Sequence, residues 1–141
     1  MNVPEQTEWT IPQTEEITGV PALLARDWVA HNFIVVEHPA KGRGSKNRLT
    51  INDLYKIKCF DFLMKNQVVR KDAKEIVKAF SDYNAREPFL HVFKTGDNLE
   101  TKWLSKIVRS IHEADLLMVI DSRKITKSIN IKVLPGTIKI S

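Results

Sequence analysis

The spacing of apolar residues near the start of the chain predicts two short helices in immediate succession. Residues 10–20 form the first, because proline suits a first helical turn and Gly19 can adopt the left-handed conformation that ends a helix. Pro21 opens the second, whose apolar residues share one face: Leu24, Ala25, Trp28 and Val29. Two short helices joined by a tight glycine turn are typical of a helix-turn-helix.

A short strand and a basic loop are predicted after these helices. Residues 33–36 are β-branched or aromatic and too few for a stable helix, so they are predicted to form a strand. The loop over residues 39–47 contains two glycines and three cations, and residues 48–50 return as in a hairpin. A basic, flexible hairpin directly after a helix-turn-helix is typical of a wing.

Two amphipathic helices follow the predicted wing. Thr50 and Asp53 have the spacing of a capping box, with aspartate in place of the usual Glu or Gln, and residues 66–67 end that helix. Another helix covers about residues 71–80. The side chains expected to be buried are Leu54, Ile57, Phe60, Leu63 and Met64 in the first helix and Ala73, Ile76, Val77 and Phe80 in the second.

The pattern changes after residues 84–88, a polar segment that ends in proline and is predicted to be a linker. The elements predicted beyond it are a strand at 89–93, a turn at 95–98, an amphipathic helix at 101–113 and a buried strand at 116–120. This order gives a small β-α-β unit. From residue 121 onward the pattern fits either a helix followed by a strand or simple alternation.

The expected fold class is therefore α+β, in two parts. Residues 1–83 are predicted to form a winged helix-turn-helix domain, mostly helical with a two-stranded wing, and residues 89–141 a small α/β assembly or regulatory unit. A chain of 141 residues is long enough for this arrangement. No apolar run approaches the roughly 20 residues that span a bilayer. Residues 1–8 lack the features of a secretory signal, so we expect a cytoplasmic protein without a membrane partner.

Charge is unevenly distributed along the chain. The net charge is +5, but residues 1–38 contain one base and six acids, whereas residues 39–74 contain ten bases and three acids. Cations clustered on one segment release counterions from phosphate, so a polyanion would meet the middle of this chain. A solvated, lysine-rich face is the alternative interpretation.

The N-terminal part resembles the MerR-type transcriptional regulators over roughly residues 9–80. The resemblance is carried by Thr10-Ile11, Ile17-Thr18-Gly19-Val20 and Arg26-Asp27-Trp28, and by the acid-leucine pair Asp53-Leu54 after the wing. Two features depart from that family: Asn47-Arg48 replaces a tyrosine-arginine pair, and a β-α-β unit replaces a long dimerisation helix. The amino-terminal domains of phage Mu-type repressors and transposases, which also combine a helix-turn-helix with a basic wing, are the second resemblance.

The first resemblance implies a sequence-specific, DNA-binding transcriptional regulator that binds double-stranded DNA. Its second helix would lie in the major groove, with Ala22 and Leu23 touching thymine methyl groups. Arg26 would contact phosphate by the resemblance, or a base by its position on the helix. The residues predicted to contact DNA are Ala22, Leu23, Arg26, His31, Lys41, Arg43, Lys46, Asn47, Arg48, Arg70 and Lys71. Lys56 and Lys58 are weaker candidates, since exposed lysines on an amphipathic helix need no function.

Other classes of protein receive less support from the sequence. The four histidines are scattered and Cys59 is the single cysteine, so we expect no enzyme activity, metal or cofactor. Two alternatives stay open: a phage or mobile-element accessory factor that bends DNA, and a protein-interaction adaptor that does not bind DNA. An incomplete sheet of about three strands would be more stable when paired with a copy of itself, so we expect a homodimer.

Overall fold

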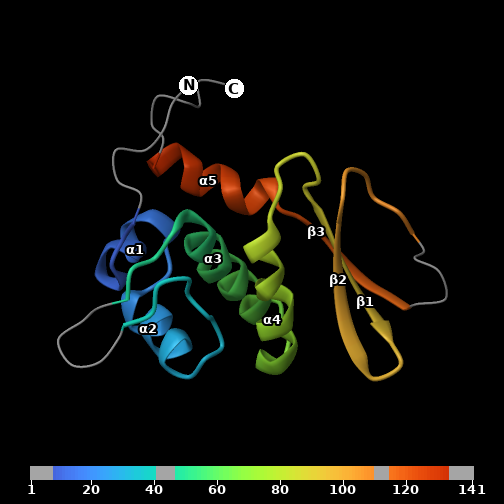
Figure 1. The fold of residues 1–141 in the computed structure, drawn as a ribbon, viewed down its shortest axis with the longest axis horizontal. Coiled ribbons are helices and arrows are strands. Elements are labelled where there is room, and N and C mark those ends of the chain that lie inside the picture. The colour runs from blue at the N-terminus through green and yellow to red at the C-terminus, as the bar shows by residue number, and fades with distance from the viewer. Residues whose placement is uncertain (1–7, 41–46, 110–114, 134–141) are drawn as a thin grey trace.

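Helices dominate the N-terminal half of the molecule, and a sheet follows them (Figure 1). The computed structural model describes residues 8–40, 47–109 and 115–133. The elements are α1 (Ile11–Thr18), α2 (Ala22–Ala30), α3 (Ile51–Lys65), α4 (Arg70–Val77), the 3-10 helix η1 (Lys78–Asp82), β1 (Phe89–Thr95), β2 (Asn98–Leu104), β3 (Asp115–Asp121) and α5 (Arg123–Val133). The predicted α+β class is confirmed.

The end of α1 at Gly19 and the capping box at the start of α3 form as the sequence predicts, although α1 is shorter than the predicted range of 10–20. The backbone N–H of Thr10 donates to Gln13 Oε1 at 2.9 Å, and Gly19 ends α1 with a φ of 76°. At the start of α3, Asp53 N–H donates to Thr50 Oγ1 at 3.4 Å, while Asp53 Oδ2 accepts from Thr50 N–H at 2.9 Å. The capping box with aspartate is therefore confirmed.

The predicted apolar faces of α3 and α4 form the centre of the core. All nine predicted side chains are buried there except Met64, which is partly exposed. Trp28 is also buried, with its ring centroid 4.7 Å from that of Phe60. The prediction for Leu24 is wrong, because this side chain is 43% exposed. On α2 only Ala25 and Trp28 are buried, so Leu24 lies beside the buried stripe.

The strand predicted at residues 33–36 does not form. The backbone N–H groups of Phe33 and Ile34 instead donate to the Trp28 carbonyl at the end of α2. Ile34 and Val36 are buried and Val35 is exposed, so buried and exposed side chains alternate here as in a strand. The segment nevertheless pairs with no neighbouring strand among the described residues. The described part of the predicted wing contains only isolated backbone pairs, His38 with Arg48 and Trp9 with Leu49. Its tip, residues 41–46, lies outside the described residues.

The predicted β-α-β unit is also wrong. Residues 98–104 form β2 rather than a helix, and the three strands make an antiparallel sheet in the order β2-β1-β3. Gly96, with a φ of 65°, allows a tight turn that pairs Thr95 with Asn98. Once this hairpin forms, Leu99, Thr101 and Trp103 alternate along β2 and so lie on one face of the sheet. This strand packing outweighs the helical spacing of apolar residues from which the sequence predicted a helix at 101–113. The predicted strand at 116–120 forms as part of β3, but the prediction that it is buried is wrong, because among these five residues only Ile120 is buried and Leu117 is exposed.

The last described helix, α5, returns to the N-terminal part, where it packs against α1 and α3 (Figure 1). Tyr55 Oη on α3 donates to Asn130 Oδ1 on α5 at 2.6 Å.

The division at residues 84–88 stays a prediction, although buried side chains on both sides of that segment belong to one cluster. No helix in the described ranges is long and apolar enough to cross a membrane.

Burial on α3 predicts a loss of stability at alkaline pH. Exclusion from water raises the pKa of Tyr55 and of the Cys59 thiol to about 12 each, from 10.0 and 9.0. A raised pKa contributes stability that is complete below the unfolded value and is lost as pH rises to the folded one. We expect the free energy of unfolding, measured by urea denaturation, to fall steadily from about pH 9 upward. For Cys59→Ala, the free energy of unfolding should fall less steeply with pH than for the wild type. Equal slopes for the two proteins would contradict the contribution of Cys59.

Candidate nucleic-acid interface

Helix α2 presents the surface on which the sequence places base recognition. Leu23 is 74% exposed and Arg26 is exposed, whereas Ala22 is half-buried. At the other end of the helix, His31 Nδ1 lies 2.9 Å from the Asp27 main-chain oxygen and 3.1 Å from its carboxylate. His31 therefore caps the end of α2, and its side chain is 63% exposed.

The N-terminus of α2 is already occupied by an acidic side chain. Glu15 Oε1 accepts a hydrogen bond of 2.8 Å from the Ala22 backbone N–H. A free helix N-terminus attracts phosphate, but here a carboxylate from α1 satisfies the first donor and supplies the negative charge. The interface of α2 is therefore its exposed side rather than its N-terminal end.

The base of the predicted wing is held together by polar side chains. Asn47 Oδ1 accepts from the Ala40 backbone N–H at 2.7 Å, which joins the two sides of the loop. Arg48 is 63% exposed and lies 3.5 Å from Glu8, whose carboxylate also lies 3.7 Å from His38 Nε2. Asn47 thus has a structural role that the sequence did not show, and Arg48 is accessible but paired. The predicted wing residues Lys41, Arg43 and Lys46 lie outside the described residues.

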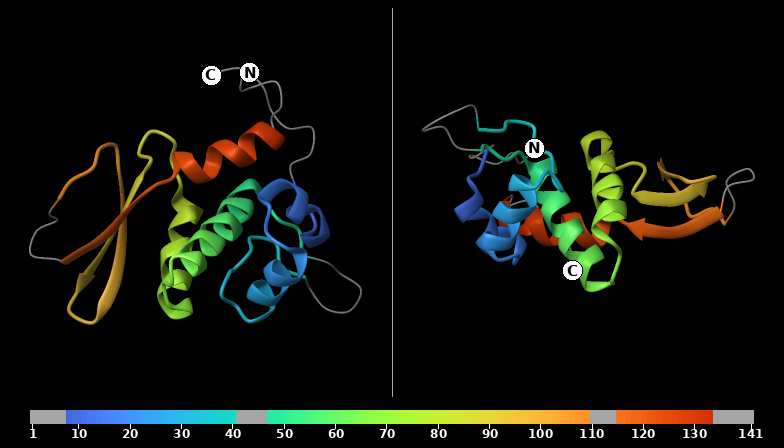
Figure 2. Two further views of the ribbon diagram at one scale, coloured as in Figure 1. Left: turned by 180° about the vertical axis from the view of Figure 1, so that it is seen from behind. Right: turned by 90° about the horizontal axis from the view of Figure 1, so that it is seen from below.

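The start of α4 brings two further cations to the end of α2. Arg70 and Lys71 are exposed residues of its first turn. The guanidinium carbon of Arg70 lies 5.7 Å from the centre of the Phe33 ring, just beyond α2. This cation–π contact offsets the unfavourable placement of Arg70 near the positive end of a helix dipole. In Figure 1 the end of α2 and the start of α4 lie along the lower side of the molecule, opposite α5, and the view from behind in Figure 2 agrees.

Lys56 and Lys58 are not exposed lysines of an amphipathic helix, so that expectation is wrong. Lys56 is 4% exposed, and its ammonium donates to the Val35 carbonyl at 3.0 Å and lies 3.5 Å from Asp53 Oδ1. Lys58 donates to the Thr18 carbonyl at 2.9 Å, at the end of α1. Both lysines tie α3 to the segments on either side of α2, and so hold that helix in place.

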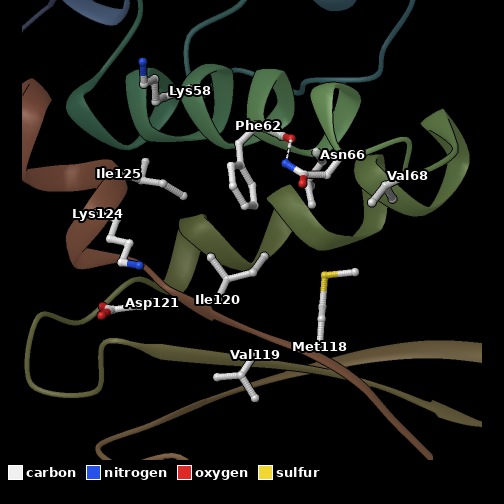
Figure 3. A pocket seen from close by; sticks show the side chains of 11 residues that line it. Lys58, Phe62, Asn66, Val68, Met118, Val119, Ile120, Asp121, Lys124 and Ile125 are labelled. Carbon is white, nitrogen blue, oxygen red and sulfur yellow. Dashed lines mark hydrogen bonds between the residues drawn. The ribbon is translucent and has the colours of Figure 1, made fainter.

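A pocket lies between the end of α3, β3 and the start of α5 (Figure 3). Its volume is about 480 Å³, and Phe62, Met118 and Ile120 supply apolar walls. Polar groups on its wall are mostly engaged: Lys58 bonds to Thr18, and the Asn66 amide nitrogen donates to the Phe62 carbonyl. A specific ligand site needs a few converging polar groups, and this wall offers few.

Comparison with models of known protein families and with curated proteins finds no match to this chain. The site therefore has to be interpreted from its own residues. Within the described ranges, no group of three or more His, Cys, Asp or Glu side chains lies where it could hold a metal ion. What the surface offers is an exposed helix face with Arg26 at its middle, and the cations Arg48, Arg70 and Lys71 on neighbouring segments.

Sequence reasoning missed three of the groups that shape this surface. These are the carboxylate of Glu15 at α2, the Glu8 side chain beside Arg48, and the buried pair of Asp53 and Lys56. The last had a signal, because a base three residues after an acid shares its face of a helix. The other two contacts join separate segments, so spacing along the chain does not show them.

Proposed function

We propose that this protein is a sequence-specific DNA-binding transcriptional regulator with a winged helix-turn-helix. The observation that supports it most directly is the α1–Gly19–α2 unit. One face of α2 is fixed in the core by Ala25 and Trp28, while the opposite face leaves Leu23 and Arg26 exposed. A helix held in this way can enter a major groove as a recognition helix.

Cations around α2 support the same proposal. Arg70 and Lys71 at the start of α4 and Arg48 at the base of the wing are exposed, and contacts to phosphate would fix the orientation of the domain on the duplex. The basic residues of the wing would add phosphate or minor-groove contacts, as the sequence predicts. Leu23 would contact a thymine methyl group, and the exposed His31 ring would be a polar group for base recognition.

Binding of a random-sequence duplex at increasing salt concentration tests this function. We expect binding at low salt and a linear fall of log K with log salt, with a slope that corresponds to several phosphates. A duplex library selected on the protein would then identify the specific site. Failure to bind duplex DNA at low salt would contradict the proposal.

Arg26 offers a second test, because phosphate contact and base contact have different signatures. The side chain lies at the middle of a nine-residue helix, next to the acidic Asp27. We expect Arg26→Ala to weaken binding equally for all sequences and to reduce the salt slope by about 1, as loss of a phosphate contact does. A loss confined to the selected site, with an unchanged slope, would assign Arg26 to a base instead.

A protein-interaction adaptor is the second candidate, and two side chains favour it. Leu23 and Leu24 are adjacent on α2 and are 74% and 43% exposed. Neighbouring exposed leucines are suited to an apolar partner surface. The duplex titration separates the two functions, since an adaptor has no reason to show a steep salt dependence on DNA.

A further inference from the structure

Strand β2 is an edge of the sheet. In the order β2-β1-β3, β2 pairs only with β1 among the described residues, so its outer backbone groups face away from the sheet. Helix α4 packs against β2, and the Trp103 indole donates to the Ala79 carbonyl at 2.8 Å. The sheet stands at the end of the molecule away from α1 and α2 (Figures 1 and 2). Edge strands of this kind are templates for pairing with another chain.

We propose that the partner of this edge is a second copy of the chain, in a two-fold antiparallel pairing of β2 with β2 centred on Thr101. In that register, Glu100 of each copy lies opposite Lys102 of the other, on the exposed face of the sheet. Leu99 of each copy lies opposite Trp103 of the other, on the face that packs against α4. Opposite charges and aromatic–aliphatic pairs are both favourable directly across a pair of strands.

The charges select this register over its neighbours. A two-fold centre on Glu100 or on Lys102 would place two like charges opposite each other, which destabilises a strand pair. A shift of the register by one residue would pair the exposed face of one copy with the helix-covered face of the other. Of the two oxygens of Glu100, Oε2 already accepts from Thr95 Oγ1 at 2.9 Å, which leaves Oε1 for the partner's lysine.

The other edge of the sheet is less suited to such pairing. The register between β1 and β3 shifts between Val92 and Phe93, and a bulge of this kind twists an edge away from flat pairing. A two-fold pairing of β3 centred on Met118 would also place Asp115 opposite Asp121 of the second copy. The structure therefore assigns the interface to β2.

Charge exchange across the two-fold axis gives a specific test by sedimentation of the full chain without DNA. Glu100→Lys and Lys102→Glu each create two repulsive pairs in place of two attractive ones, so each variant alone should dimerise about tenfold to a thousandfold more weakly than the wild type. An equimolar mixture of the two variants should dimerise again, because each lysine of one chain then faces a glutamate of the other. Glu100→Lys combined with Lys102→Glu in one chain should also restore the dimer.

Cross-linking tests the position of the two-fold axis. Thr101→Cys should form an intermolecular disulfide under mild oxidation, because residue 101 lies opposite its own copy. Asn98→Cys is the matched control, since the two copies of residue 98 would be about 20 Å apart, beyond the reach of a disulfide. Cys59 is buried and does not compete.

A wild type that sediments as a monomer at micromolar concentration would overturn the proposal, as would a dimer that neither single charge variant weakens. Since these measurements need no DNA, they are independent of the proposed function. If the β2 dimer and the proposed DNA-binding function both hold, the two copies of α2 are related by a two-fold axis, and the selected DNA site should be a palindrome.

Discussion

Replacing Lys56 by methionine should destabilise the protein by about 3–5 kcal/mol, the cost of removing one partner of a buried ion pair. The ammonium of Lys56 is the cation nearest to Asp53, whose side chain is fully buried and whose Oδ1 atom accepts no hydrogen bond. Methionine keeps most of the side-chain volume, so the loss reports the charge rather than a cavity. The melting temperature should fall by about 10–17 °C for a chain of this size, measured by circular dichroism.

Two controls separate the buried pair from a general effect of removing lysines. Lys65→Met removes an exposed cation that lies 2.9 Å from Asp61 on the same helix, and should cost about 0.5 kcal/mol or less. Combining Lys56→Met with Asp53→Asn should restore part of the stability, because no unpaired charge remains and the amide oxygen can still accept from Thr50 N–H. If the double variant loses as much unfolding free energy as the two single variants together, the pairing of Lys56 with Asp53 is contradicted.

The buried lysine also connects the core to the proposed interface. Lys56 bonds to the carbonyl of Val35, in the segment that follows α2, and Lys58 bonds to the carbonyl of Thr18, just before it. Helix α2 is only nine residues long, too short to be stable alone. Its position therefore depends on these two bonds together with the burial of Ala25 and Trp28. Loss of Lys56 should consequently weaken DNA binding even at temperatures where the variant stays folded.

The sequence predicted best those features that depend on near neighbours in the chain. The turn at Gly19, the cap formed by Thr50 and Asp53 and the apolar face of α4 are set within a few residues, and all were found as expected. The segment at 33–36 was misinterpreted because alternating burial does not require a partner strand. The helix predicted at 101–113 was displaced by a hairpin whose strands pair across the turn at Gly96. Both errors arose because the pattern within one segment does not show whether that segment pairs with a neighbouring strand.

The candidate interface divides in the same way. Exposure of Leu23, Arg26 and Arg70 follows from their place on a helix, so sequence spacing was sufficient to select them. The carboxylate of Glu15 at the start of α2 was not predictable, because that contact depends on how two helices meet. It changes the chemistry expected of the site, since it closes the helix N-terminus to phosphate and leaves that role to cations elsewhere.

If the proposed function holds, the predicted wing should make the largest contribution to DNA affinity. Changing Lys41, Arg43, Lys46 and Arg48 together to alanine removes four of the ten cations in residues 39–74. If each neutralises one phosphate, the log–log salt slope should fall by about 3–4, and affinity at 0.15 M salt should fall roughly 10²- to 10³-fold. Fluorescence anisotropy with a labelled random duplex measures both quantities.

The matched control removes the same number of charges from residues outside the predicted wing and α2. Lys94, Lys106, Lys124 and Lys127 are exposed residues of the sheet, the loop after β2 and α5. Their joint change to alanine lowers the net charge equally but leaves the wing and α2 intact, so its slope should stay close to that of the wild type. Equal losses in the two variants would mean that DNA responds to the total charge of the chain, and the wing would lose its assigned role. A loss confined to the wing variant would locate phosphate contact beside α2, where a recognition helix needs it.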